Sequence, residues 1–302
     1  MAEFIRRHDL AAPSATYSTL RLLGFLAGWP ALFVLARLAG NPAVWVAAWT
    51  VQALILEGCN IGAHEAAHRN LYRSRAWNSV AGALWSIPIL YDFPAYRTTH
   101  RQHHARTHVP GEDSEPIFGE SRLLGYLGYM LVSGTSYVLI LVFEGLKGAA
   151  GRGAPWMSAG TRRRQALVGT LILFGSVALL VVGFVEAPGL TVEIWLVPFL
   201  VYTLVLAPMV SHPEHTDCGF GPAPALETTR TTVSNRLIRF FVWHVNLHAA
   251  HHLSPSVPGQ KLMPLHELTA SANHHVCPSY TRWHLGYLRG LLQGDPTPGS
   301  TI

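Results

Sequence analysis

Long runs of apolar residues alternate with short polar segments through most of this chain. A helix that crosses a membrane needs about 20 mainly apolar residues. The pattern predicts two helical hairpins, made by residues 20–39 with 43–56 and by residues 166–185 with 192–210. The 43–56 segment is the shortest, but it continues directly into a polar helical extension that begins at Glu57. The turns of the two hairpins contain the chain-reversing residues Gly40-Asn41-Pro42 and Ala187-Pro188-Gly189.

Two further apolar segments do not fit this pattern. Residues 76–91 are few for a crossing and are interrupted by Pro88, which favours an interfacial or partly re-entrant segment. Residues 123–146 are long enough to cross but rich in Gly, Ser, Thr and Tyr, and they lead towards Arg162-Arg163-Arg164. If this segment crossed, those arginines would face the outside, against the positive-inside rule. We therefore expect it to lie along the interface or to dip in and out.

The distribution of charge predicts the orientation of the chain. Hydrophobic residues make up 49% and charged residues only 13%, about half the charged share of a soluble protein. The net charge is +5, yet both tight turns lack Lys and Arg, whereas the termini and the longer polar loops are basic. Basic loops mark the cytoplasmic side of a membrane, so the turns are expected to face outward. This explains the positive charge without a nucleic-acid partner.

The expected fold is an all-α integral membrane protein with about four transmembrane helices in two hairpins, interfacial helices and a cytoplasmic helical cap. Residues 1–302 are predicted to form a single domain, with 1–18 as a cytoplasmic lead-in and 267–302 as a cytoplasmic C-terminal tail. The lead-in is charged and lacks the apolar core of a signal peptide. The three cysteines form no CxxC pair, so neither a zinc ribbon nor a disulfide framework is expected. In a bacterium the membrane would be the inner, cytoplasmic one.

Three histidine clusters lie in segments on the predicted cytoplasmic side. They are His64-Glu65-Ala66-Ala67-His68, His100-Arg101-Gln102-His103-His104 and His248-Ala249-Ala250-His251-His252. Residues three and four apart share one face of a helix, so each cluster directs two or three imidazoles to one side. Their eight histidines exceed the roughly four to six ligands of one first-row metal ion, so two ions are expected. The near absence of thiolates favours redox-active irons over structural zinc.

Other known histidine motifs explain fewer of the eight clustered histidines. The first cluster matches the HExxH motif of zinc proteases, with Glu65 as general base, but that function leaves six clustered histidines unexplained. Glu65 with His68 is also half of the ExxH signature of carboxylate di-iron bundles, and the sequence has no second ExxH. Haem ligation uses isolated histidines on facing helices, and a metal transporter would carry its ligands within the spans.

The clusters and their surroundings resemble the membrane fatty acid desaturase superfamily, which also contains hydroxylases and related oxygenases. The similarity extends from about residue 62 to residue 266. It rests on Gly62-Ala63-His64-Glu65-Ala66-Ala67-His68-Arg69; on His103-His104-Ala105-Arg106-Thr107-His108 with Glu115-Pro116; and on Thr229-Arg230-Thr231, Asn235, Arg239-Phe240 and Trp243, followed by the third cluster and Pro255-Ser256-Val257-Pro258.

The resemblance implies a non-haem centre of two Fe ions and a ninth histidine ahead of the third cluster. His215 is the best match for the ninth ligand, with His212 as the reserve. The implied ligand set is His64, His68, His100, His103, His104, His215, His248, His251 and His252. Further candidates for ligands or for nearby partners are His108, His212, His244 and Glu65.

Two positions depart from the pattern of many relatives. Ala250 stands where many carry Glu, which removes an expected hydrogen-bond acceptor beside the ligands. His244 stands where many carry Asn, which adds a ligand candidate or proton carrier. The ligand set itself is intact.

The resemblance also implies O2 as co-substrate and an external electron donor of the ferredoxin, rubredoxin or cytochrome type. The sequence lacks the cysteine spacing of an iron–sulfur carrier and a haem-binding context. The expected reaction is desaturation of an acyl chain or related aliphatic substrate, with no catalytic side chain beyond the metal centre. Hydroxylation or mono-oxygenation of a lipid or of a small non-lipid metabolite stays open, because the outcome depends on substrate placement.

Overall fold

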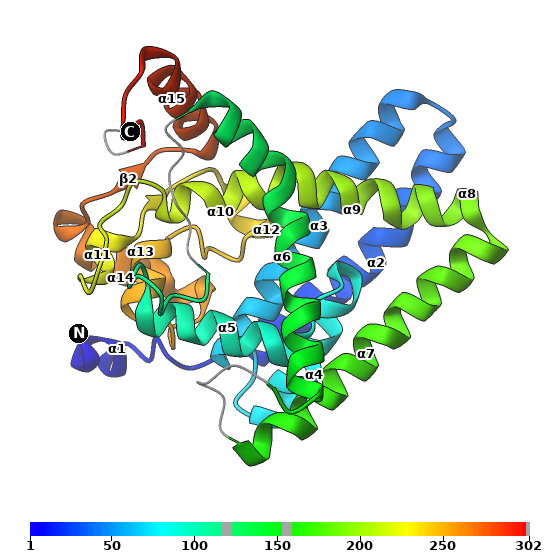
Figure 1. The fold of residues 1–302 in the computed structure, drawn as a ribbon, viewed down its shortest axis with the longest axis horizontal. Coiled ribbons are helices and arrows are strands. Elements are labelled where there is room, and N and C mark those ends of the chain that lie inside the picture. The colour runs from blue at the N-terminus through cyan, green and yellow to red at the C-terminus, as the bar shows by residue number, and fades with distance from the viewer. Residues whose placement is uncertain (116–121, 153–158, 300–302) are drawn as a thin grey trace.

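The computed structural model describes residues 1–115, 122–152 and 159–299, apart from the side chains of residues 159–162. Pro116 and the side chain of Arg162, both used above, lie outside the described residues. The described chain is mostly helical, and its strands are two short ones, β1 (Thr231–Thr232) and β2 (Val276–Cys277), which pair in parallel. Figure 1 shows the long helices extending to one side and the short elements gathered with the N-terminus on the other.

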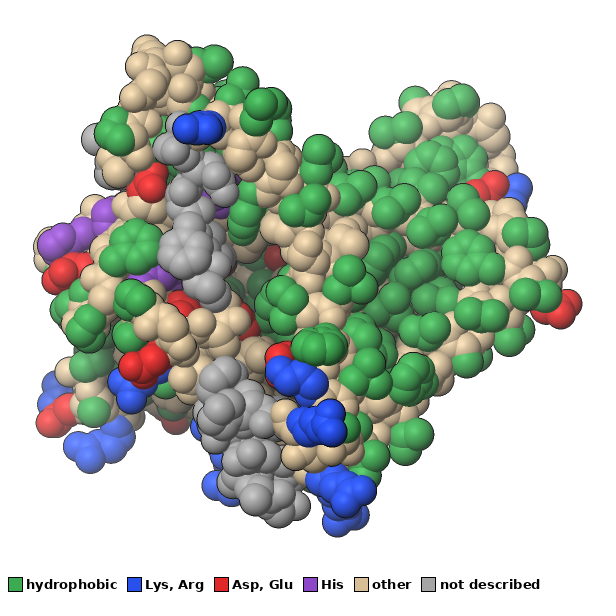
Figure 2. Space-filling model, in the orientation of Figure 1, with side chains coloured by type: hydrophobic (Ala, Val, Ile, Leu, Met, Phe, Trp, Pro, Cys, Tyr) green, Lys and Arg blue, Asp and Glu red, His purple; other side chains and the backbone are tan. Residues whose placement is uncertain are grey.

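Five helices are long and apolar enough to cross a membrane, judged by length and composition. They are α2 (Ala15–Ala39), α3 (Pro42–His68), α6 (Leu123–Ala149), α7 (Ala159–Glu186) and the run Pro188–His215. In Figure 2 hydrophobic side chains cover the long helices, whereas charged side chains gather mainly over the short elements and along the lower edge. The composition of these helices and their exposed apolar faces indicate an integral membrane protein.

The helix α6 is the candidate beyond the four expected spans. It is one continuous helix of 27 residues. Near its start, the Tyr126 hydroxyl lies 2.7 Å from Nδ1 of His284 in α15 (Tyr280–Gln293). Near its end, a Cβ on Gly145 would collide with the carboxylate of Asp92. Both ends of α6 therefore contact elements on the side of the short helices.

The run from Pro188 to His215 is a single interrupted helix. It consists of α8 (Pro188–Thr191), the π-helical turn η2 (Val192–Leu196), α9 (Val197–Val201), the π-helical turn η3 (Tyr202–Leu206) and α10 (Ala207–His215). Pro198 lacks the N–H that would bond to the carbonyl of Ile194. The indole N–H of Trp29 donates to that carbonyl instead, at 3.1 Å. The interruption thus ties this helix to α2.

Short helices between the spans place the second histidine cluster. The apolar segment with Pro88 forms α4 (Arg75–Ser86) and the 3-10 turn η1 (Ile87–Ile89), neither of which is long enough to be a candidate span. The helix α5 (Phe93–Arg106) begins where Asp92 accepts a hydrogen bond from the backbone N–H of Ala95 at 3.0 Å. Pro94 in the first turn of α5 also favours a helix start. The second cluster therefore lies on the last turns of a well-capped helix.

The remaining short elements lie on the side of the molecule where α3 and α10 end (Figure 1). They are α1 (Ala2–Arg7), α11 (Ala225–Thr228), α12 (Arg236–Phe241), α13 (His248–Leu253), η4 (Gly259–Lys261), α14 (Leu262–Thr269), η5 (Ala270–Ala272) and α15. Trp243 docks this region on α3, because its buried indole N–H donates to the carbonyl of Gly58 at 3.0 Å. Trp283 and Tyr287 of α15 are also fully buried, so the predicted C-terminal tail contains a packed helix.

Candidate metal centre

The larger group of histidine nitrogens draws on all three clusters. The helix α3 continues without a break to His68, as the sequence predicted, so His64 and His68 lie one turn apart on the same face. His100 and His104 come from α5, and His251 comes from α13. One nitrogen from each of these five residues lies within 4.8 Å of one nitrogen from each of the others. This group therefore resembles a ligand set in number, type and spacing.

The second group lies beside the first. It contains His103, His215 and His252, all buried, with nitrogens again within 4.8 Å of one another. Nε2 of His248 lies 3.0 Å from Nε2 of His215, which adds a fourth histidine. The rings of His104 and His252 stack at 4.0 Å between centroids and so connect the two groups. All nine histidines of the implied ligand set thus converge.

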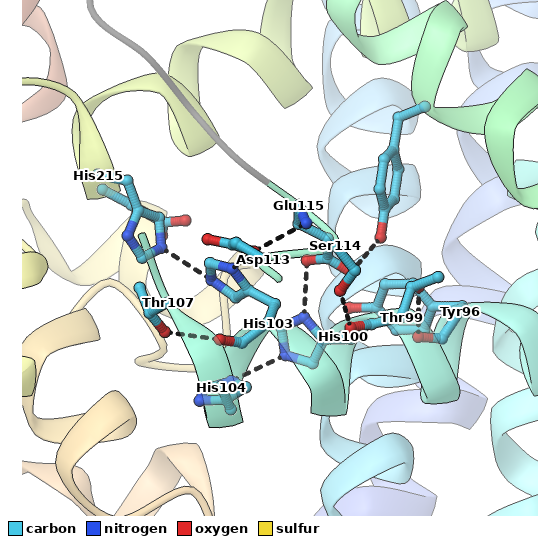
Figure 3. Close-up of polar contacts among 12 residues, drawn as sticks. Tyr96, Thr99, His100, His103, His104, Thr107, Asp113, Ser114, Glu115 and His215 are labelled. Atoms are coloured by element: carbon cyan, nitrogen blue, oxygen red, sulfur yellow. Dashed lines mark hydrogen bonds and ion pairs between the residues drawn. The ribbon is translucent and has the colours of Figure 1, made fainter. Parts of the chain in front are cut away.

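Two carboxylates orient the rings of the second cluster (Figure 3). Oε2 of Glu115 lies 3.0 Å from Nδ1 of His100, and Oδ1 of Asp113 lies 2.8 Å from Nδ1 of His103. Since an ionised carboxylate only accepts hydrogen bonds, each Nδ1 carries the proton and each Nε2 keeps a lone pair. The same arrangement fixes the tautomer and the ring orientation of metal-binding histidines in other proteins.

The close approach of the Nε2 atoms fits a metal ion. Nδ1 of His215 donates to the carbonyl of Thr228 at 3.2 Å. Nε2 of His215 is therefore unprotonated and also carries a free lone pair. It lies 3.2 Å from Nε2 of His103 and 3.0 Å from Nε2 of His248. A proton can join only two of these three nitrogens, whereas a metal ion can bind all of them. Among the described residues, the buried Nε2 atoms of His64, His68 and His252 also have no hydrogen-bond partner.

The protonation state of the rings also suits metal binding. Burial, with the neighbouring imidazoles as a second cause, lowers the pKa of His248, His251 and His252 well below the usual value. These rings are therefore neutral near pH 7, and neutral imidazole is the form that binds a metal. His103 differs: burial alone would lower its pKa, but the hydrogen bond to Asp113 and the charges of Glu115 and Asp113 raise it.

Glu65 does not point into either group of nitrogens. Its Oε2 accepts the backbone N–H of Gly259 at 2.8 Å, and its Oε1 accepts from the side chain of Asn70 at 3.4 Å. Oε1 also lies 3.5 Å from Nδ1 of His64. The carboxylate joins the first cluster to the loop after the third cluster but forms no hydrogen bond with His64. This role differs from that of the glutamate in a zinc protease, which must reach a metal-bound water.

His212, the reserve for the ninth ligand, is buried outside both groups. Its Nδ1 lies 3.0 Å from the hydroxyl of Thr216, and its ring lies between the rings of Tyr129 and Trp283, at 4.3 and 5.4 Å between centroids. His215 instead lies within the second group. The helix α10 continues through Pro213 to His215, so the two rings, three residues apart, point about 60° apart around its axis.

The other candidates lie at the margin of the centre. His108 is beside the second group, with its ring 5.2 Å from that of His215 and its Nδ1 hydrogen-bonded to the carbonyl of Gly219 at 2.7 Å. His244 belongs to neither group and lies near the positive charges of Arg21 and Arg239. Ala250 packs in the apolar core beneath α13 rather than against the ligand rings. A glutamate at position 250 would therefore have to enter this apolar core.

The sequence reasoning missed the residues that support the ligands. The sequence alone does not single out Asp113, and Glu115 enters only as part of the resemblance. Arg230, fully buried, donates to the carbonyls of Pro213 and Thr216 at 2.6 and 2.8 Å and so holds the backbone on both sides of His215. Acidic residues within fifteen positions of a histidine cluster were the available signal, but it does not distinguish Asp113 from its exposed neighbour Glu112.

Comparisons with known proteins identify a family for this chain. The family model described as fatty acid desaturase matches residues 42–283. An sn-1 oleoyl-lipid 12-desaturase of Picosynechococcus sp. is 25% identical over 231 residues, which cover 71% of this chain and 65% of the relative. A chloroplastic omega-6 fatty acid desaturase of Spinacia oleracea is 23% identical over 247 residues, or 73% of this chain and 51% of the relative.

A second cyanobacterial relative gives a similar result. The sn-1 oleoyl-lipid 12-desaturase of Synechocystis sp. is 24% identical over 246 residues, which cover 74% of this chain and 67% of the relative. The chain thus spans about half to two thirds of the length of these relatives. Because the family match covers most of the chain and contains all three histidine clusters, the chain belongs to the fatty acid desaturase family.

Proposed function

We propose that the nine histidines bind two iron ions and that the protein desaturates the acyl chain of a lipid. O2 is the oxidant, and an external ferredoxin, rubredoxin or cytochrome supplies electrons. The observation that carries this proposal is the convergence of nine buried or half-buried histidines as two adjacent groups, with Nε2 of His215 facing Nε2 of His103 and of His248. The names of the relatives support an acyl-lipid substrate.

The irons would supply the oxidising power to remove hydrogen from an unactivated C–H bond, which no side chain provides. The protein's own residues orient the ligands and limit the access of water. Tyr96 stacks on His100 with centroids 5.4 Å apart, and the Tyr137 hydroxyl donates to Glu115 at 2.8 Å. Tyr91 packs against both tyrosines. These aromatic rings form a mainly apolar wall beside the centre, suited to an aliphatic chain.

The positions of the two histidine groups support four membrane crossings. His68 ends α3 and His215 ends α10, and their groups are adjacent, so both ends lie on one side of the bilayer. The chain between them must cross an even number of times. α7 and the run Pro188–His215 account for two crossings, and a third by α6 would separate the groups. We therefore propose that α6 lies along the interface and that the centre faces the cytoplasm, as the positive-inside rule indicates.

The metal content tests the proposed function directly. Purified protein is expected to contain about two irons per chain and no haem, as the number and type of the ligands indicate. Elemental analysis and absorption spectroscopy check this result. With O2, an electron-transfer system and host lipids, mass spectrometry is expected to find an acyl product that lacks two hydrogen atoms. A product with one added oxygen atom would assign a hydroxylase, and a single zinc with O2-independent peptide cleavage would contradict the proposal.

The orientation is tested by single cysteines in intact cells. Ala43→Cys and Gly189→Cys are expected to react with a membrane-impermeant thiol reagent, whereas Glu112→Cys and Ser256→Cys are expected to react only after permeabilisation. The substituted positions Ala43 and Ser256 are exposed, and the three native cysteines are buried, so background labelling is low. Reaction of Glu112→Cys and Ser256→Cys from opposite sides would contradict a common metal centre.

A further inference from the structure

A groove with a volume of about 680 Å³ opens between α4, α5 and α7. Its volume is within the roughly 300–1,000 Å³ of typical small-molecule sites. None of the residues that line it belongs to the two histidine groups. Its apolar lining includes Ala76, Ala83, Phe93, Val168 and Ile172, and its polar lining includes Arg97, Arg164 and Gln165. The groove is apolar along its walls and cationic at one place, and it shares Tyr91 with the aromatic wall beside the centre.

The groove lies where the apolar surface of the molecule meets a basic edge. On α7, Val168 within the groove is 50% exposed and the neighbouring Leu171 is 69% exposed, as expected for a helix that faces lipid. Figure 2 shows Lys and Arg side chains gathered at the lower edge of the molecule, with hydrophobic side chains on the helices above them. A ligand in this groove would contact hydrocarbon and the basic edge at the same time.

Arg97 gives the groove a positive charge and hydrogen-bonds to neutral groups. Arg97 is half-buried, and its guanidinium donates to two neutral oxygens, the Ser79 hydroxyl at 3.3 Å and the Gln165 amide at 2.9 Å. Burial, followed by the nearby charges of Arg69 and Arg101, lowers its pKa. Over residues 1–115, 122–152 and 163–299, no carboxylate forms an ion pair with the guanidinium of Arg97. A partly buried cation without a counter-ion attracts an anion.

We propose that this groove binds an anionic phospholipid of the bilayer, with its phosphate against Arg97 and Arg164 and an acyl chain along the apolar walls. A small soluble anion would leave these walls unused, and a lipid without net charge would not balance the arginines. Arg97 precedes His100 by one turn of α5, so the bound lipid contacts the helix that carries the second histidine cluster. The site does not depend on the iron chemistry proposed above.

Lipid binding to the detergent-solubilised full chain tests the proposal. Native mass spectrometry compares saturated phosphatidylglycerol with phosphatidylcholine of equal chain length, without an electron donor, so that no turnover occurs. The wild type is expected to prefer phosphatidylglycerol by roughly tenfold or more, the order expected for two arginine contacts with an anionic lipid. The double variant Arg97→Gln with Arg164→Gln is expected to lose the preference, and Arg163→Gln, at a position outside the groove lining, is expected to keep it.

A second pair of variants tests the apolar part of the groove. Ala83→Trp is expected to fill the groove and to reduce the binding of both lipids, whereas Leu84→Trp, at an exposed position of the same helix, is expected to bind like the wild type. Equal binding of the two lipids by the wild type, or an unchanged preference in the double arginine variant, would overturn the proposal. Iron content is measured on the same samples. Protein without iron that still prefers phosphatidylglycerol would refute the proposed function and not the lipid site.

Discussion

Replacing His215 with alanine is expected to lower the iron content from about two to about one per chain and to lower activity by more than about 100-fold. The physical reason is its position: its Nε2 lies 3.2 Å from Nε2 of His103 and 3.0 Å from Nε2 of His248, so it is central to the second group. His251→Ala, in the first group, is expected to cause a similar loss. Iron is measured by elemental analysis on monodisperse protein, and activity by product mass spectrometry.

His212→Ala is the matched control. This ring is as buried as that of His215 and only three residues away, but it packs against Tyr129 and Trp283. The variant is expected to lose stability, because truncation leaves a cavity, and to keep most of its iron. Full iron in His215→Ala together with loss of iron in His212→Ala would assign the ninth ligand to His212 and refute the second group as described.

Removing the carboxylates behind the second cluster is expected to have the next largest effect. Asp113→Ala and Glu115→Ala should each reduce iron affinity and activity by roughly 10- to 100-fold, the usual cost of losing a partner that orients a metal-binding histidine. Each change takes away the acceptor of one Nδ1 proton, on His103 or on His100. Competition with an iron chelator measures the affinity, and the rate of product formation measures activity.

The same loop provides a control and a rescue. Glu112 pairs with Arg106 at the exposed surface, at 3.1 Å, so Glu112→Ala is expected to leave iron affinity unchanged. Glu115→Gln keeps an oxygen that accepts from His100 and is expected to recover part of the loss. If Glu112→Ala and Glu115→Ala lowered affinity equally, the effect would come from the loop as a whole and not from the orientation of a ligand.

Part of the histidine site could be predicted from the sequence. The four-residue spacings predicted pairs that the structure keeps in one group, whereas the three-residue pairs fall into different groups. The family resemblance selected His215 ahead of His212. The division of the histidines into two groups did not follow from spacing. His103 and His104 are neighbours in sequence but belong to different groups, because successive residues on a helix point about 100° apart. Which group each joins depends on where α10 and α13 pack.

The membrane topology was also predicted in part from the sequence and in part only from the tertiary structure. Apolar runs and the arginine distribution by themselves predicted the two hairpins, since hydrocarbon thickness and membrane charge act on local sequence. For residues 123–146, apolar content did not decide whether the segment crosses the membrane, and only the position of the following arginines argued against a crossing. The tertiary structure adds the contacts of α6, which reach Asp92 at one end and His284 at the other. Those contacts join residues 53 and 158 positions apart, so no local pattern contains them.

What the sequence determined by itself is the set of chemically competent residues: three helical histidine clusters at the ends of apolar segments. What only the tertiary structure decided is the environment of those residues. It brought Asp113 and Glu115, but not Glu112, to the Nδ1 atoms of the second cluster, and it turned Glu65 towards the backbone of Gly259. Loop conformation and side-chain direction depend on packing between distant segments, and a carboxylate in sequence has the same chemistry whether it faces a ligand or the solvent.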